Sequence, residues 1–178
     1  FYIDNIFDNT LFFEKNNQFL EGTGSMVLDR ENKIAYASIS ERTNKKLFID
    51  WCMTMKFKSV SFFAIDSEKP IYHTNVLMSV CQSMVFICLD AIIDVTEKEE
   101  LVSLFIKTKK EIIEITKEQM NSFLGNVLEL KNNNNESFLI MSSSAFNSLN
   151  SSQKKVINKK SNILHTPLDT IEYFGGGS

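Results

Sequence analysis

The sequence contains little cysteine, and its cysteines are not spaced to form a structural framework. Cys52, Cys81 and Cys88 are odd in number, so they cannot all pair within the chain, and their spacing is not that of a zinc site. We therefore expect neither a disulfide nor a metal framework. A reducing compartment follows, and the cytoplasm is the predicted location.

A surplus of one charge and a long apolar run are also missing. The chain carries 19 basic and 22 acidic residues, a net charge of -3, without a basic block, so neither nucleic acid nor an anionic membrane is an expected partner. The longest apolar run, residues 84–89, is far shorter than the roughly 20 residues that a helix needs to cross a bilayer. No signal-peptide pattern opens the chain. We expect a soluble protein whose partners are small molecules or proteins, with a homo-oligomer among the alternatives.

What is present suffices for one domain. At 178 residues and 43% hydrophobic composition, residues 1–178 can form a compact unit that buries roughly 70% of its unfolded surface. The chain begins at Phe1 rather than Met and stops at Gly-Gly-Gly-Ser, residues 175–178. We interpret both ends as cuts, with an appended flexible linker as the alternative for the last four residues.

Hydrophobic periodicity predicts a first β-β-α-β unit over approximately residues 19–65. Two strands joined by a polar turn come first, at residues 19–30 and 33–38. Ser40 is the predicted cap of the following helix, whose apolar side chains, Cys52 included, recur at helical spacing before a strand at 59–65.

The same order of elements recurs twice, over approximately residues 75–115 and 126–165. The second unit is predicted to contain strands at 75–81, 84–89 and 111–115 and a helix at 97–109. A short helix begins at Thr116, with Gln119 placed for a capping box. The third unit then contains strands at 126–130, 137–141 and 162–165 and helical residues 143–158. The predicted class is α/β, and a period of roughly 50 residues is typical of propeller-like arrays.

Two residues suited to acid–base chemistry stand at the starts of the first two units. Glu21 lies beside two glycines. His73, one of two histidines, comes just before the apolar strand at 76–81. Each residue alone is more often structural, but a cyclic arrangement of the units would aim both toward its axis. There Glu21 would orient the imidazole, and His73 would move protons to and from a leaving amine. A nucleophile is still needed, because Cys52 and Cys88 are expected to be core residues and Cys81 is also more often structural.

Three motifs carry a family resemblance. They read FLEGTGSMVLDR at residues 19–30, YHTNV at 72–76 and GGGS at the end of the chain. With them the chain resembles the citrulline-utilisation hydrolase and amidinotransferase-type family, and the dimethylargininases, in the arginine deiminase or pentein superfamily. Shorter similarities at 87–90, 125–129 and 170–172 extend the resemblance over nearly the whole chain.

The resemblance implies a five-bladed α/β propeller of which this chain holds about three modules, with roughly the N-terminal two-fifths absent. It also implies a cysteine thiolate that attacks a guanidinium or ureido carbon, with His73 as the proton carrier and Glu21 as the acid that orients it. The nucleophile would lie a few residues beyond Ser178, so this chain alone is expected to be inactive. Neither a metal nor an organic cofactor is implied, and the partner is a small-molecule amino-acid substrate.

Asn75 departs from the pattern of the arginine deiminases, which carry an aspartate there to bind a guanidinium. The resemblance therefore implies that Asn75 binds the substrate and that the substrate carries a neutral ureido group, as citrulline does. Two alternatives stay open. One is an amidinotransferase, which passes the amidino group to an amine, and the other is a non-catalytic binding protein on the same fold.

Overall fold

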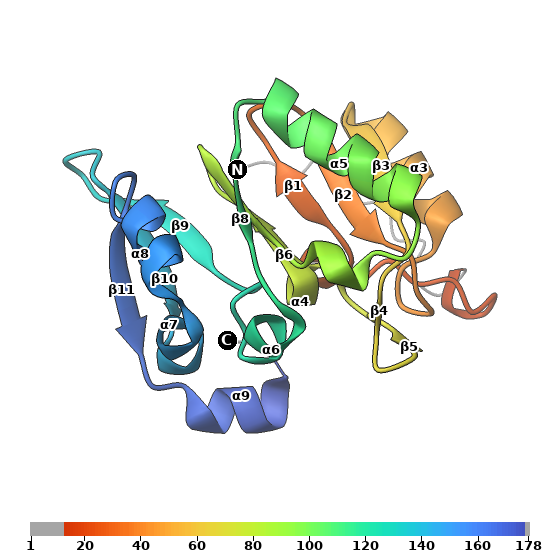
Figure 1. Cartoon of the computed structure of the whole chain (residues 1–178). Helices are drawn as coiled ribbons and strands as arrows, with labels where there is room; N and C mark the ends of the chain where they lie inside the picture. The colour runs from red at the N-terminus through yellow and green to blue at the C-terminus, as the bar shows by residue number, and fades with distance from the viewer. Residues whose placement is uncertain (1–12, 177–178) are drawn as a thin grey trace.

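Three three-stranded sheets follow one another along the chain in the computed structural model, which describes residues 13–176 (Figure 1). A two-stranded sheet of β4 (Ile65–Asp66) and β5 (Lys69–Pro70) lies between the first and second of them in sequence. The first sheet contains β1 (Val27–Asp29), β2 (Ile34–Ser38) and β3 (Lys58–Phe62). Helix α3 (Lys45–Met55) connects β2 to β3, so these two strands are parallel, whereas β1 and β2 are antiparallel. Cys52 is buried on the face of α3 that packs on this sheet, as its spacing predicted.

The second sheet repeats this topology with β6 (Met78–Val80), β7 (Met84–Ile87) and β8 (Glu111–Glu114). β7 is antiparallel to β6. It is parallel to β8, because helix α5 (Val95–Lys107) connects β7 to β8. Asp94 begins this helix by accepting hydrogen bonds from two backbone N–H groups of its first turn.

The third sheet contains β9 (Leu128–Lys131), β10 (Ser137–Ser142) and β11 (Asn162–Thr166), again with β10 antiparallel to the first strand and parallel to the last. The prediction of helical residues over 143–158 is confirmed except at 149–150 and 158. Two helices, α7 (Ser143–Ser148) and α8 (Ser151–Ile157), connect β10 to β11. They are separate because Asn150 is extended and caps α8 with a capping box, which starts a new helix there.

The three β-β-α-β modules confirm the predicted α/β class and its repeated unit. Helix α6 (Lys117–Asn121) lies between the second and third modules and begins with the capping box predicted at Thr116. The largest apolar cluster is centred on β7, whose residues are all buried, and reaches Phe62 in the first module and Leu139 in the third. The modules therefore share one core. Within residues 13–176, no helix is long and apolar enough to span a membrane.

Two predicted strands begin later than expected. Residues 22–25 form the helical turn α2 (Gly22–Ser25), and residues 74–77 form α4 (Thr74–Leu77), so β1 and β6 are each three residues long. The prediction of strand over 19–26 and 75–77 is wrong. The reason is that the Ser25 and Thr74 hydroxyls bond to backbone groups that a strand ladder would use.

The predicted helix cap at Ser40 is also wrong. Asn44 caps α3, because its side chain accepts a hydrogen bond from the Leu47 N–H. Ser40 lies too early in the chain for this role. It instead donates its hydroxyl hydrogen to the Tyr72 carbonyl at 2.8 Å, which ties the loop after β2 in the first module to the segment that precedes the second.

Candidate active site

Glu21 and His73 meet where the first two modules adjoin. Glu21 is the residue that begins α2, and His73 is the residue that begins α4, so the two occupy corresponding positions before β1 and β6. Their side chains are in contact, with 2.6 Å between Glu21 Oε2 and His73 Nε2. The exposed fraction of the side chain is 32% for Glu21 and 18% for His73, so the pair is partly shielded yet open to a small molecule.

Arg42 joins this pair and was missed from the sequence. Its Nη2 donates to the same Glu21 oxygen at 2.6 Å, and its guanidinium lies over the Tyr72 ring, 5.5 Å from the centroid. The hydrogen bond from Arg42 is the main cause that lowers the pKa of Glu21, with partial burial opposing it and His73 adding to it. Glu21 is therefore ionised at neutral pH. The available signal was that Arg42 is one of only two arginines in the chain.

Gly24 allows the imidazole to pack against the backbone of α2. A Cβ at this position would lie 2.7 Å from His73 Cε1 and 2.8 Å from His73 Nδ1, closer than real contacts permit. On the other side, the Tyr72 ring centroid is 4.9 Å from that of His73. The ring is thus held between Gly24 and Tyr72, and the absence of a side chain at Gly24 sets its position.

We expect Gly24→Ala to reduce turnover about 10- to 100-fold, because the added methyl group displaces His73 from Glu21. The measurement is kcat in the naturally encoded, full-length protein. Gly22→Ala is the matched control, since it adds the same methyl group with nothing within 4 Å and its φ of +51° adds only backbone strain. Equal losses of kcat in the two variants would contradict the role of Gly24.

A cavity of about 450 Å³ opens beside this pair. His73 lies on its wall together with Asn75, which is the third predicted site residue, and with residues of α6 and of the chain end. The described lining residues are Arg42, Tyr72, His73, Asn75, Val76, Met120, Asn121, Phe123, Asn126, Gly175 and Gly176. The backbone carbonyl of Asn75 accepts a hydrogen bond from Asn126 Nδ2 at 3.2 Å, which fixes this part of α4. None of the described lining residues is an aspartate or a glutamate.

The end of the described chain returns to this cavity. Helix α9 (Asp169–Gly175) is held through Glu172, which accepts a hydrogen bond from the Ser144 hydroxyl at 2.8 Å. At Gly176 the chain is so close to Tyr72 that an added Cβ would lie 3.4 Å from its hydroxyl. Gly176, the last residue that the structure describes, therefore lies beside the ring that packs on His73.

The cysteines lie elsewhere. Cys52, Cys81 and Cys88 are free and buried, and none lines the cavity of His73. Burial raises the pKa of Cys52 to about 11 and of Cys81 to about 12, and burial also raises the pKa of Cys88. None of them is a thiolate at neutral pH. Among residues 13–176, no group of three His, Cys, Asp or Glu side chains is placed to hold a metal ion.

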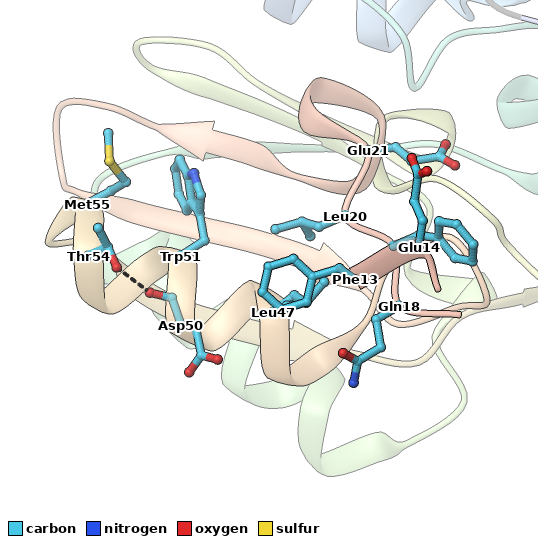
Figure 2. A pocket seen from close by; sticks show the side chains of 11 residues that line it. Phe13, Glu14, Gln18, Leu20, Glu21, Leu47, Asp50, Trp51, Thr54 and Met55 are labelled. Atoms are coloured by element: carbon cyan, nitrogen blue, oxygen red, sulfur yellow. Dashed lines mark hydrogen bonds between the residues drawn. The ribbon is translucent and has the colours of Figure 1, made fainter. Parts of the chain in front are cut away.

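A larger cavity, of about 730 Å³, lies between residues 13–21 and α3 (Figure 2). Figure 2 shows apolar side chains such as Leu47 and Trp51 along it, with Glu21 at one end. Its described lining residues include neither a histidine nor a basic residue. We place the candidate active site at the smaller cavity because His73 and Arg42, which both contact Glu21, line it.

Comparison with known proteins gives a family and a fold. The family model described as N,N dimethylarginine dimethylhydrolase, eukaryotic, matches residues 2–178. No curated protein matches this chain. Several solved structures of pentein fold do resemble it, at sequence identities at which the likeness shows the fold alone.

One of them is the apo form of ArgZ, an arginine dihydrolase from the ornithine-ammonia cycle in cyanobacteria. It has a TM-score of 0.68 and 19% identity, over 94% of this chain and 26% of that chain. The N-terminal domain of ArgZ bound to substrate has a TM-score of 0.67 and 19% identity, over 94% and 60% of the two chains. SxtG, an amidinotransferase from Microseira wollei in the saxitoxin biosynthetic pathway, has a TM-score of 0.58 and 14% identity, over 87% and 42%. This chain thus spans between about a quarter and three-fifths of these structures.

Proposed function

Because this chain belongs to the eukaryotic N,N dimethylarginine dimethylhydrolase family, in the pentein superfamily, we propose that the protein hydrolyses a C–N bond of a ureido or guanidino amino acid. The preferred substrate in this proposal is citrulline. The observation that carries it is the contact of His73 with Glu21 at the wall of a cavity whose other described polar residues are Arg42, Tyr72 and three asparagines.

The proposed reaction has two steps. A cysteine thiolate attacks the ureido carbon, the bond from this carbon to the departing nitrogen breaks, and His73 donates a proton to that nitrogen. A water molecule then gives a proton to His73 and attacks the same carbon, and the C–S bond breaks. The resulting carbamate loses carbon dioxide to leave ornithine. Glu21 holds the imidazole in place for both proton transfers, and the short Glu21–His73 contact supports this role.

The thiolate in this proposal is not one of the three cysteines in the chain, because all three are buried and their thiols are protonated at neutral pH. In this proposal the nucleophile lies shortly after Ser178, as the resemblance implies. The approach of Gly176 to Tyr72 supports this part of the proposal, since Gly176 thereby lies beside the ring that packs on the imidazole.

The choice of citrulline over arginine rests on charge. A guanidinium ion in a partly buried cavity needs a carboxylate, and the described lining residues supply amides instead. Asn75 and Asn126 offer neutral donors and acceptors that suit a ureido group. Arg42, which alone among these lining residues has a fixed positive charge, would attract the carboxylate of an amino-acid substrate.

The test is an assay of the naturally encoded, full-length protein with citrulline, arginine and methylated arginines. Ammonia, amine and ornithine are measured with and without a thiol alkylating reagent. Ammonia and ornithine released from citrulline, and lost on alkylation, would support the proposal, whereas amine released from methylarginine would move the assignment to a dimethylargininase. The 178-residue chain by itself should release nothing. No turnover by the full-length protein would favour an amidinotransferase or a binding protein.

The same assay tests Asn75. We expect Asn75→Asp to raise the ratio of kcat/KM for arginine to kcat/KM for citrulline about tenfold, ~1.4 kcal/mol, because the new carboxylate can pair with a guanidinium. Asn134→Asp, an identical change at the exposed hairpin tip, controls for the added negative charge. If both variants have the wild-type ratio, Asn75 does not determine the substrate.

A further inference from the structure

Two buried hydroxyl groups link the three segments that carry Glu21, Arg42 and His73. The Ser25 hydroxyl accepts a hydrogen bond from the Glu21 N–H at 2.8 Å and donates to the Arg42 carbonyl at 2.8 Å. The Thr74 hydroxyl donates to the Ser25 carbonyl at 2.6 Å. It also accepts a hydrogen bond from the backbone N–H of Ser38, at the end of β2, at 2.8 Å.

Each hydroxyl in this chain of hydrogen bonds is both a donor and an acceptor. Ser25 and Thr74 are both fully buried, so neither group can exchange its partner for water. The hydrogen bonds of Thr74 fix α4 relative to α2 and β2. His73 is the residue that immediately precedes α4, so its position is fixed as well. The position of Ser25 fixes the start of α2 relative to the loop of Arg42.

Buried hydroxyls nearby do not behave in this way. Among the described residues, the Ser38 and Thr43 hydroxyls are buried without a hydrogen-bond partner. Full use of both hydrogen-bonding capacities is therefore not a general property of this part of the core. It occurs at the two hydroxyls that connect the segments bearing the candidate catalytic residues.

We propose that Thr74 and Ser25 are positioning residues, whose buried hydroxyls hold α2, α4 and the Arg42 loop in the arrangement that brings Glu21, His73 and Arg42 together. This inference rests on the proposed function. Neither hydroxyl lines the cavity of His73. Both act through the segments that they connect, so they should affect the geometry of proton transfer more than the affinity for substrate.

Thr74→Val removes the hydroxyl and keeps the shape of the side chain. In the full-length protein we expect its kcat for citrulline to fall about 10- to 100-fold, with KM changed less than about threefold. Thr74→Ser, which restores the hydroxyl, should recover most of the lost kcat. Thr43→Val is the matched control, because it removes a buried hydroxyl that has no partner, and it should keep the wild-type kcat. Ser25→Ala is a second route to the same loss if Thr74→Val does not fold.

A wild-type kcat in Thr74→Val or Ser25→Ala would overturn the proposal. So would equal losses in Thr74→Val and Thr74→Ser, because the methyl group rather than the hydroxyl would then matter. All variants are compared below their unfolding temperatures, so that loss of folded protein is not read as loss of kcat.

A second readout does not depend on turnover. The imidazole N–H resonance of His73 is identified by its disappearance in His73→Ala and followed by NMR in the other variants. We expect it to shift or broaden in Thr74→Val and to keep its wild-type position in Thr43→Val. An unchanged resonance in Thr74→Val would refute the positioning role. If the wild-type protein turns over none of the substrates, the proposed function fails while this resonance still decides the positioning role.

Discussion

Replacement of His73 by alanine is expected to reduce turnover of citrulline by about 10³-fold or more, because one side chain would supply both proton transfers of the proposed reaction. The fold should survive, since the imidazole is a partly exposed side chain at the junction of two modules and not a core residue. Steady-state kcat and kcat/KM of the full-length protein measure the effect. Circular dichroism and urea unfolding establish that the variant is folded.

Two further variants make this test specific. His165→Ala removes the chain's other histidine, whose ring stacks on Phe146 in the third module with 3.9 Å between the ring centroids. This variant should keep wild-type turnover. Glu21→Gln keeps the shape of the acid and removes the charge that contacts both His73 and Arg42. Its kcat should fall by a smaller factor, about 10- to 100-fold, because the histidine is still present. Wild-type activity in His73→Ala would refute the assignment of this site.

The second large effect is on stability. Lys110 lies just before β8 and pairs with Asp29 at the end of β1, with 3.2 Å between Lys110 Nζ and Asp29 Oδ2. Each side chain has an exposed fraction of only 2%, and Lys110 also donates to the carbonyls of Cys81 and Gln82. Lys110→Met should lower the free energy of unfolding by about 3–5 kcal/mol, because it leaves the Asp29 carboxylate buried without its partner. Urea unfolding of the full-length protein measures this loss.

The control is the same substitution in an exposed pair. Lys160 pairs with Glu111 at 3.1 Å, with exposed fractions of 29% and 44%, so Lys160→Met should cost about 0–1 kcal/mol. The double variant Lys110→Met, Asp29→Asn should lose less than the sum of the two single variants, since no charge is then left unpaired. A loss in Lys110→Met no larger than that in Lys160→Met would show that burial does not strengthen this pair.

The order of strands and helices was predictable because its signals are local. The capping box at Thr116 and the apolar face of α3 around Cys52 each depend on residues within two helical turns. Predictions failed where contacts between modules override local preference. The first part of the predicted strand 19–30 and the start of 75–81 are helical turns, and α2 and α4 are fixed by hydroxyl bonds to segments up to 49 residues away.

The candidate site was predictable in part for the same reason. Glu21 and His73 were selected because they occupy corresponding positions in two repeated units. A cyclic array of such units directs corresponding residues toward its common axis, so they come close together. Arg42 has no counterpart in that argument. It reaches Glu21 because Ser25 holds the carbonyl of Arg42, a contact that spans 17 residues. Asn75 was selected from the resemblance. The structure places it on the cavity wall, and its binding of substrate stays a proposal.

By itself, then, the sequence determined the α/β class, the three repeated units, the burial of Cys52 and Cys88, and the choice of Glu21 and His73 as candidate site residues. These depend on periodicity and on chemistry within a short stretch of chain. Only the tertiary structure decided that Arg42 shares the Glu21 oxygen with His73, that Gly24 seats the imidazole and that Lys110 pairs with Asp29. Each of these contacts joins residues more than 20 positions apart. The packing of one module on the next brings them together, and local sequence preferences carry no information about that packing.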